Sequence, residues 1–315
     1  MPKNTKILLS IALILSVLAY ISLNKGNKKD TIESEDAQFA VADSGSVDKI
    51  ELITQSGTVS LLNANGTWSV DNAYKADVNK LAQLCTFIYK VQATKPVYKE
   101  LENKINRQIR TKGIKINAYV GNELVRQYTV ALDSANAYTA YGKIGNVGNL
   151  YTLEIPGGEI KLAKLFDNQP ILWKDKTVFN SLSRNINRVK IAFSATPKDG
   201  FELVSGLTKF EVVGMPKSDS VKIKSFLELF KNVEVKSYIT ENQANIRDSL
   251  LKIAPSFSIS LEDRMATKSN SIKIFYQPKQ NGEIYGLLGS SDELVSIRPM
   301  IFEYILQKRS FFEVK

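Results

Sequence analysis

One stretch of the chain gathers cations at spacings that suit contact with an anionic surface. Lys and Arg recur between residues 99 and 115, and only Glu100 and Glu102 dilute them. Such a cluster is typical of contact with phosphate-rich partners, and equally of an ordinary solvated helix face. No aromatic residue interleaves the charges, which argues against single-stranded nucleic acid, where stacking platforms accompany the basic groove. We expect no nucleic acid partner. The candidate contact residues are Lys104, Arg107, Arg110, Lys112 and Lys115.

Catalytic chemistry finds little support elsewhere in the chain. The sequence has no histidine and one cysteine, Cys85. Catalytic triads with histidine, Cys-His pairs and histidine-ligated zinc or haem are therefore excluded. A Ser-Lys hydrolase pattern fails at Ser225, because the third residue after it is Glu228. The acids that could pair as general acid and base show no diagnostic spacing; they are Asp133, Glu154, Asp167, Asp175, Glu262 and Asp263.

Glycine and tryptophan positions have structural explanations. Gly142, Gly145 and Gly148 lack the Lys-Ser/Thr ending of a phosphate-binding loop, and strand-like sequence follows them. They predict a turn or bulge. Trp68 and Trp173 stand in strand-like or apolar surroundings, which favours core positions. We therefore expect no catalytic residue, no cofactor and no metal site; a histidine-free hydrolase stays a third hypothesis.

The N-terminal segment predicts a membrane anchor. Ile7 to Leu23 is a run of 17 uncharged residues with lysines on both sides. As a helix it would span about 25 Å, the short end of a bilayer core. A cleaved signal peptide, with Val17 and Ala19 at the cleavage site, is the alternative. Apolar residues continue beyond Ala19, which favours an uncleaved anchor.

The position of this segment also predicts where the rest of the chain lies. An apolar run after only six residues resembles a signal anchor that translocates everything downstream. We therefore expect a single-pass protein of the inner membrane with its soluble region in the periplasm. The polar stretch from Asn24 to about Asp36 is typical of a tether.

Short segments that match one another predict an internal repeat. Period-2 alternation, as in Lys49 to Leu52, indicates half-buried strands. Apolar residues at helical spacing follow the strands over 78–91 and 223–233, with Asp77 and a residue of Ser218 to Ser220 as N-caps. Cys85 belongs to the first apolar stripe, which predicts a buried thiol. Four pairs of segments match in order: 48–52 with 187–191, 141–145 with 285–289, 150–155 with 294–298, and 171–174 with 305–308.

The predicted fold class is α+β, a tandem duplication of an antiparallel-sheet-plus-helix unit after one N-terminal transmembrane helix. The predicted divisions are residues 1–36 as anchor and tether, 37–182 as the first repeat, and 183–315 as the second.

One set of positions in the first predicted repeat follows a known pattern. The set is Phe39, Val41, Asp43, Val47, Lys49, Ile50, Gly66 to Trp68, Val70 and Tyr74 to Asp77. With these residues the repeat resembles domain-of-unknown-function family 4340, found in bacterial envelope proteins. The likeness covers about residues 39–180 and is faint in the second repeat, where Phe210 or its neighbours replace Trp68. Some family members resemble, or are fused to, the auxiliary component of gliding-associated ABC transporters. The resemblance thus implies an envelope accessory role through partners and carries over no catalytic residue.

Two functions therefore stay open alongside the hydrolase. The first is a non-enzymatic, membrane-anchored accessory or scaffold protein that binds transporter, secretion or gliding subunits. The second is a module that binds an anionic polymer or lipid headgroups through residues 99–115. The net charge of +10 suits the second, and the predicted anchor suits both.

Overall fold

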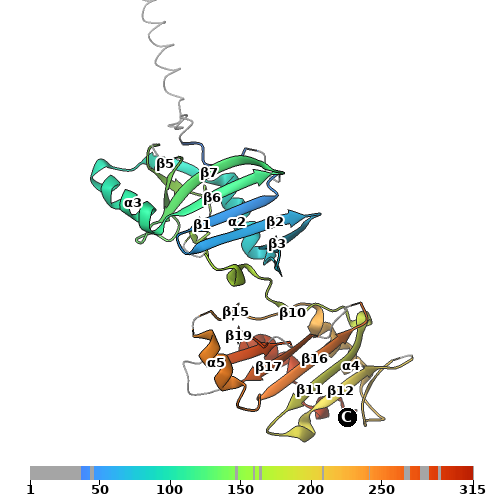
Figure 1. Ribbon diagram of the computed structural model, residues 1–315. Helices are drawn as coiled ribbons and strands as arrows, with labels where there is room; N and C mark the ends of the chain where they lie inside the picture. Colours follow the sequence, from blue (N-terminus) through green and yellow to red (C-terminus); the bar gives the residue numbers. More distant parts are fainter. Residues whose placement is uncertain are drawn as a thin grey trace, which may run out of the picture. The chain divides into compact units, whose positions relative to one another are not determined.

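The computed structural model describes residues 37–42, 46–145, 148–158, 160–162, 165–207, 209–240, 242–265, 270–276, 284–289 and 292–314. These residues form a nine-stranded, an eight-stranded and a two-stranded sheet, all antiparallel, together with five α-helices (Figure 1).

The nine-stranded sheet has the order β4-β3-β2-β1-β6-β7-β8-β9-β5. Its strands are β1 (Lys49–Thr54), β2 (Gly57–Ala64), β3 (Thr67–Val70), β4 (Tyr74–Lys75), β5 (Gln92–Pro96), β6 (Ile114–Val120), β7 (Glu123–Leu132), β8 (Ala140–Lys143) and β9 (Tyr151–Glu154). Asn65 and Gly66 close the β2–β3 hairpin, both at positive φ (52° and 81°), as a two-residue hairpin turn requires.

Two helices belong to this part of the chain, α2 (Val78–Lys90) and α3 (Lys99–Lys112). The predicted cap of α2 is confirmed, because the Asp77 carboxylate accepts hydrogen bonds from the amides of Asn79 and Lys80. Leu81, Leu84 and Ile88 of the apolar stripe are buried, whereas Val78 at the start of α2 is exposed. The ring of Phe87 lies 6.4 Å from that of Tyr128 on β7. This face of the sheet and α2 therefore share one core.

The opposite face of β1, β6 and β7 carries a polar network. The Tyr119 hydroxyl and the Asn117 amide donate to the Glu51 carboxylate at 2.8 and 3.1 Å, and Lys49 pairs with it at 2.7 Å. Gln127 extends the network by donating to Asn117. Burial raises the pKa of Glu51, but the hydrogen bonds from Lys49, Tyr119 and Asn117 outweigh it, so the net pKa lies below its ordinary value.

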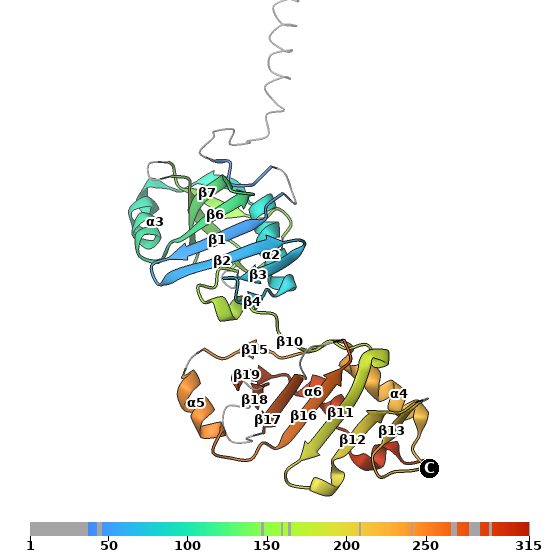
Figure 2. The ribbon, with the colours of Figure 1, turned by 45° about the vertical axis from the view of Figure 1, so that its right-hand side comes forward.

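The eight-stranded sheet has the order β13-β12-β11-β16-β17-β18-β19-β15 (Figure 2). Its strands are β11 (Ile186–Phe193), β12 (Phe201–Ser205), β13 (Phe210–Val212), β15 (Ser237–Tyr238), β16 (Phe257–Asp263), β17 (Asn270–Phe275), β18 (Ile284–Leu288) and β19 (Glu293–Ile297). The two-stranded sheet pairs β10 (Thr177–Phe179) with β14 (Val233–Glu234).

The helices of this part are short. The α-helices are α4 (Ser220–Glu228), α5 (Gln243–Leu250) and α6 (Pro299–Ile305), and the 3₁₀ turns are η3 (Pro170–Trp173), η4 (Ser183–Asn185), η5 (Pro197–Asp199), η6 (Leu229–Lys231) and η7 (Arg309–Phe312).

Aromatic packing joins α4 to the eight-stranded sheet. Phe226 of α4 lies 5.5 Å from Phe201 on β12 and 5.3 Å from Phe312 on η7, each edge to face. All three rings are buried. Asp219 caps α4, within the predicted range, by accepting from the amides of Val221 and Lys222.

By spatial contacts the chain divides into two compact units that are discontinuous in sequence. One includes the described residues up to Ser60 and from Ala82 to Asn168, and the other includes Leu61–Leu81 and Gln169 onward. The divisions at 36/37 and 182/183 stay a prediction.

The tandem duplication expected from the sequence requires correction. The described residues form mostly antiparallel sheet, with nine strands in one large sheet and eight in the other, and a repeated unit is not shown. The matched segments 48–52 and 187–191 fall in or beside β1 and β11, where alternation is the general pattern of a half-buried antiparallel strand. A Cβ at Gly142 would lie 2.3 Å from Leu153, and one at Gly286 would lie 2.9 Å from Ile297. Each glycine is therefore explained by its own close neighbour.

The sequence predicted that both tryptophans and Cys85 are buried. Trp173 is fully buried as predicted, whereas Trp68 and Cys85 are only partly buried. Burial of the Cys85 side chain nevertheless raises its pKa to about 11.

The predicted anchor, Ile7 to Leu23, lies outside the described residues. Among the residues that are described, no helix has the length and apolar composition needed to cross a bilayer.

Candidate functional site

The predicted basic segment forms α3 and the strand after it. Ile105 and Ile109 of α3 pack with Val97, Leu150 and Tyr141, which buries one side of the helix. Acidic residues occupy the first turn and basic residues the last, in agreement with the helix dipole. The 3.6-residue period therefore turns the remaining cations toward solvent.

Four of the five predicted residues, Lys104, Arg107, Arg110 and Lys112, are exposed on α3. The fifth, Lys115, is half-buried on β6, where it stands between Ile53 and Thr129 in the neighbouring strands. We call these five residues the α3 basic face. Within the described part of the chain none of the five forms an ion pair.

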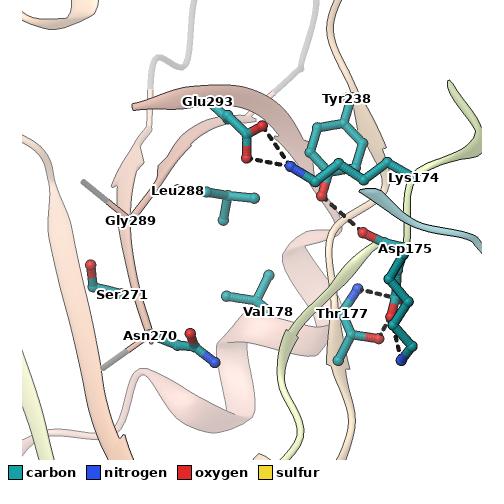
Figure 3. Close-up of a pocket in the computed structure, with 11 residues that line it drawn as sticks. Lys174, Asp175, Thr177, Val178, Tyr238, Asn270, Ser271, Leu288, Gly289 and Glu293 are labelled. Carbon is teal, nitrogen blue, oxygen red and sulfur yellow. Dashed lines mark hydrogen bonds and ion pairs between the residues drawn. The ribbon is translucent and has the colours of Figure 1, made fainter. Parts of the chain in front are cut away.

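A polar cavity of about 310 Å³ lies elsewhere, among residues that the sequence analysis did not bring together (Figure 3). Val178 and Leu288 point into it, and Asn270 and Ser271 line one side. Figure 3 shows Lys174 and Asp175 across the cavity from Asn270 and Ser271. The charged groups of the lining are Lys75, Lys174, Asp175 and Glu293.

Lys174 is held tightly at the rim of this cavity. Its ammonium donates to both carboxylate oxygens of Glu293, at 2.5 and 2.7 Å. It also lies 4.7 Å from the centre of the Tyr74 ring and 5.0 Å from that of Tyr238. The carboxylate and both ring faces stabilise the positive charge.

The carboxylate of Asp175 also has several partners. Its carboxylate pairs with Lys75 at 2.8 Å and accepts from the amide and hydroxyl of Thr177 at 3.0 and 2.7 Å. Burial raises the pKa of Asp175, but the bonds from Lys75 and Thr177 outweigh it and hold the pKa below its ordinary value. The Tyr238 hydroxyl donates to the Asp175 carbonyl at 2.9 Å, and chiefly burial raises the pKa of Tyr238.

The charged groups of the cavity therefore neutralise one another in two pairs. General acid and base catalysis needs a group that exchanges its proton near the working pH, whereas the bonds from Lys75 and Thr177 move the pKa of Asp175 further from that range. Of the six acids considered from the sequence, only Asp175 lines this cavity. Among described residues no group of three or more Asp, Glu or Cys side chains is arranged to hold a metal ion.

The sequence carried no signal for the Lys174–Glu293 pair, because its members are 119 residues apart. The sequence predicted Trp173 as a core residue and Asp175 as a scattered acid, but neither indicated this pair. The other acids lie apart: Asp133, for example, accepts from Thr139 and Tyr141 after β7.

No family model, no curated protein and no solved structure matches this chain. The resemblance to the envelope family therefore stays a prediction.

Proposed function

We propose that this chain is a non-enzymatic accessory or scaffold protein of the bacterial cell envelope. In this proposal Ile7 to Leu23 anchors it in the inner membrane as a single pass, and the described units are extracytoplasmic. Its partners are envelope membrane proteins, with transporter, secretion or gliding subunits as the first candidates. The apolar segment and the family resemblance support the location and the partner class.

The observation that carries the non-enzymatic part is the mutual pairing of the cavity's charges. Lys174 is bound by both oxygens of Glu293 and lies over two aromatic rings, and Asp175 is bound by Lys75 and Thr177. Each pair connects two segments that are far apart in the sequence, and such a connection stabilises the packing of those segments. A catalytic acid or base can also be paired, but its pKa is then moved toward the working pH, whereas the pKa of Asp175 is moved away from it.

The test is mild crosslinking of the tagged full chain in membranes, then affinity purification and mass spectrometry. We expect reproducible recovery of a small set of envelope membrane proteins. The control is the same tag on an unrelated protein fused to residues 1–36, which separates partners of the described units from neighbours of the anchor. Recovery of the same proteins with both chains, or of the chain alone, would refute the scaffold role.

The proposed extracytoplasmic location is tested by protease digestion and by the mass of the mature chain. A protease added to spheroplasts should digest the described units, and the mass of the mature chain should include residues 1–36 if the anchor is uncleaved. Protection from protease in intact spheroplasts, with digestion after lysis, would contradict the extracytoplasmic placement. Loss of the first residues at Ala19 would favour the cleaved signal peptide instead.

A second candidate function rests on the α3 basic face, whose five cations form no ion pair in the described part of the chain. In this function the face binds an anionic polymer or lipid headgroups. Each cation near such a surface contributes roughly 1 kcal/mol, or about fivefold in affinity, and salt screens the interaction.

This function can be tested with inorganic polyphosphate and with vesicles containing phosphatidylglycerol. We expect Arg107→Ala plus Arg110→Ala to weaken binding about 25-fold at low salt, because two contributions of about fivefold are lost. Lys217→Ala plus Lys231→Ala, which removes the same charge from exposed lysines of another part of the chain, is the control. Equal loss in both variants would show that net charge, not this face, drives binding.

A further inference from the structure

A second cavity, of about 260 Å³, lies beside α4 and is distinct from the polar cavity and the α3 basic face. We call it the α4 pocket. It is lined by α4, by the start of β13 with the residue before it, and by η4; Figure 2 shows α4 next to β13. Its position follows from the capping of α4 by Asp219 and the anchoring of the helix through Phe226.

The floor of the α4 pocket is apolar. Ile223 and Leu227, one turn apart on α4, are 3% and 2% exposed and belong to the core of the eight-stranded sheet. Phe210 at the start of β13 is partly buried and packs against the same core. Because Ile223 and Leu227 are already almost fully buried, a ligand resting on this floor would chiefly cover the exposed part of Phe210, and that apolar surface favours a hydrocarbon group.

The rim carries three cations from three different segments. Arg184 comes from η4, Lys209 precedes β13, and Lys224 belongs to α4. All three residues are exposed, and none of them forms an ion pair with a described residue. Like charges gathered at one opening repel one another, and an anion placed among them would relieve that repulsion.

Two acids near the α4 pocket accept hydrogen bonds. The Glu228 carboxylate accepts from the hydroxyl of Ser183, and the Asp219 carboxylate accepts from the first amides of α4. Because Ser183 lines the pocket, the Glu228 carboxylate lies beside the rim, but the three cations outnumber it and the net charge stays positive. The hydroxyl of Ser220 completes the lining as a further hydrogen-bonding group.

From this apolar floor beneath a cationic rim we propose that the α4 pocket binds a small amphiphilic anion, a short hydrocarbon chain ending in a carboxylate or phosphate. The anionic group lies among Arg184, Lys209 and Lys224, and the chain lies on Ile223 and Leu227. At about 30 Å³ for each water-sized group, the volume holds on the order of nine or ten non-hydrogen atoms. The inference does not depend on the anchor, the partners or the α3 basic face.

The probe is octanoate, which has about ten non-hydrogen atoms and so matches the pocket volume. Octanamide, equal in size but uncharged, is its matched control. Binding is measured by calorimetry with the full chain in nanodiscs of neutral lipid, which avoids a detergent that could occupy the pocket. We expect octanoate to bind with a dissociation constant on the order of a millimolar and octanamide at least about tenfold more weakly.

The variant Lys209→Met plus Lys224→Met removes two rim cations and should weaken octanoate binding at least about tenfold, because charge-assisted contacts are lost. Lys217→Met plus Lys231→Met removes equal charge from exposed lysines outside the pocket and should leave the affinity within about twofold of the unchanged chain.

Amide chemical shifts of the unsubstituted chain locate the bound octanoate without any variant. Octanoate should move the signals of residues 183–184, 209–210 and 220–227. Shifts confined to other residues, equal binding of octanoate and octanamide, or no binding of octanoate at concentrations on the order of 10 mM would each overturn the proposal.

Discussion

Asp77 combines two stabilising roles that substitutions can separate. One carboxylate oxygen accepts from the amides of Asn79 and Lys80 at 3.0 and 3.1 Å and so caps α2. The other pairs with Lys176 at 2.6 Å, and the residue is only 7% exposed. The change Asp77→Ala therefore removes the cap and leaves the lysine without this partner.

The N-cap and the ion pair contribute different amounts to the free energy of unfolding. Loss of an N-cap costs roughly 1 kcal/mol. Breaking a fully buried ion pair costs about 3–5 kcal/mol, and an exposed pair about 0–1 kcal/mol. Because the Lys176 side chain is 28% exposed and can regain water, we place the pair between these limits, at about 1–2 kcal/mol. Asp77→Ala should therefore cost about 2–3 kcal/mol of unfolding free energy, and Asp77→Asn, which keeps an acceptor for the amides, about 1–2 kcal/mol.

The assay is urea denaturation of the full chain, followed by circular dichroism, with the free energies added if more than one transition appears. Asp219→Ala is the matched control, since Asp219 caps α4 through the same two amide contacts but forms no ion pair with a described residue. It should cost roughly 1 kcal/mol. The reasoning fails if Asp77→Ala is no more destabilising than Asp219→Ala, or if Asp77→Ala and Lys176→Met are additive in a double-mutant cycle.

Three further outcomes follow from single residues. The folded-state pKa of Glu51 is lowered, so its contribution to stability should be present above about pH 4.5 and be lost as the pH falls through the folded-state pKa. In the chain with Glu51→Gln, the urea concentration at the unfolding midpoint should therefore fall less steeply as the pH is lowered. Gly142→Ala should lower the free energy of unfolding by about 1–3 kcal/mol in the same assay, since the new Cβ would lie 2.3 Å from Leu153; an unchanged midpoint would contradict the close packing. Cys85 should react with iodoacetamide at pH 8 far more slowly than a free thiol, because burial raises its pKa to about 11, and denaturant should restore the rate, as followed by mass spectrometry.

Local patterns along the chain determined the secondary structure around several of these residues. The Asp77 cap and the apolar stripe after it predicted α2. The burial of Trp173 followed from its apolar neighbours. These features depend on contacts within a few residues, where helix and strand periods and turn chemistry act directly.

The same local patterns gave a wrong prediction for the organisation of the whole chain. Alternating strands in different parts of a protein look alike because each has one buried face, so the matches at β1 and β11 suggested a duplication that the structure does not show. Likewise Lys115 was grouped with the cations before it, but Gly113 ends α3 and places Lys115 half-buried on β6.

Only the tertiary structure decided which distant side chains meet. Lys174 and Glu293 are 119 residues apart, and the rim of the α4 pocket takes Arg184, Lys209 and Lys224 from three segments. The sequence alone determined which charges the chain carries, and that histidine chemistry is absent from it. It could not determine their pairing, because an ion pair or a cavity depends on how separate elements pack, and that packing leaves no period or spacing along the chain.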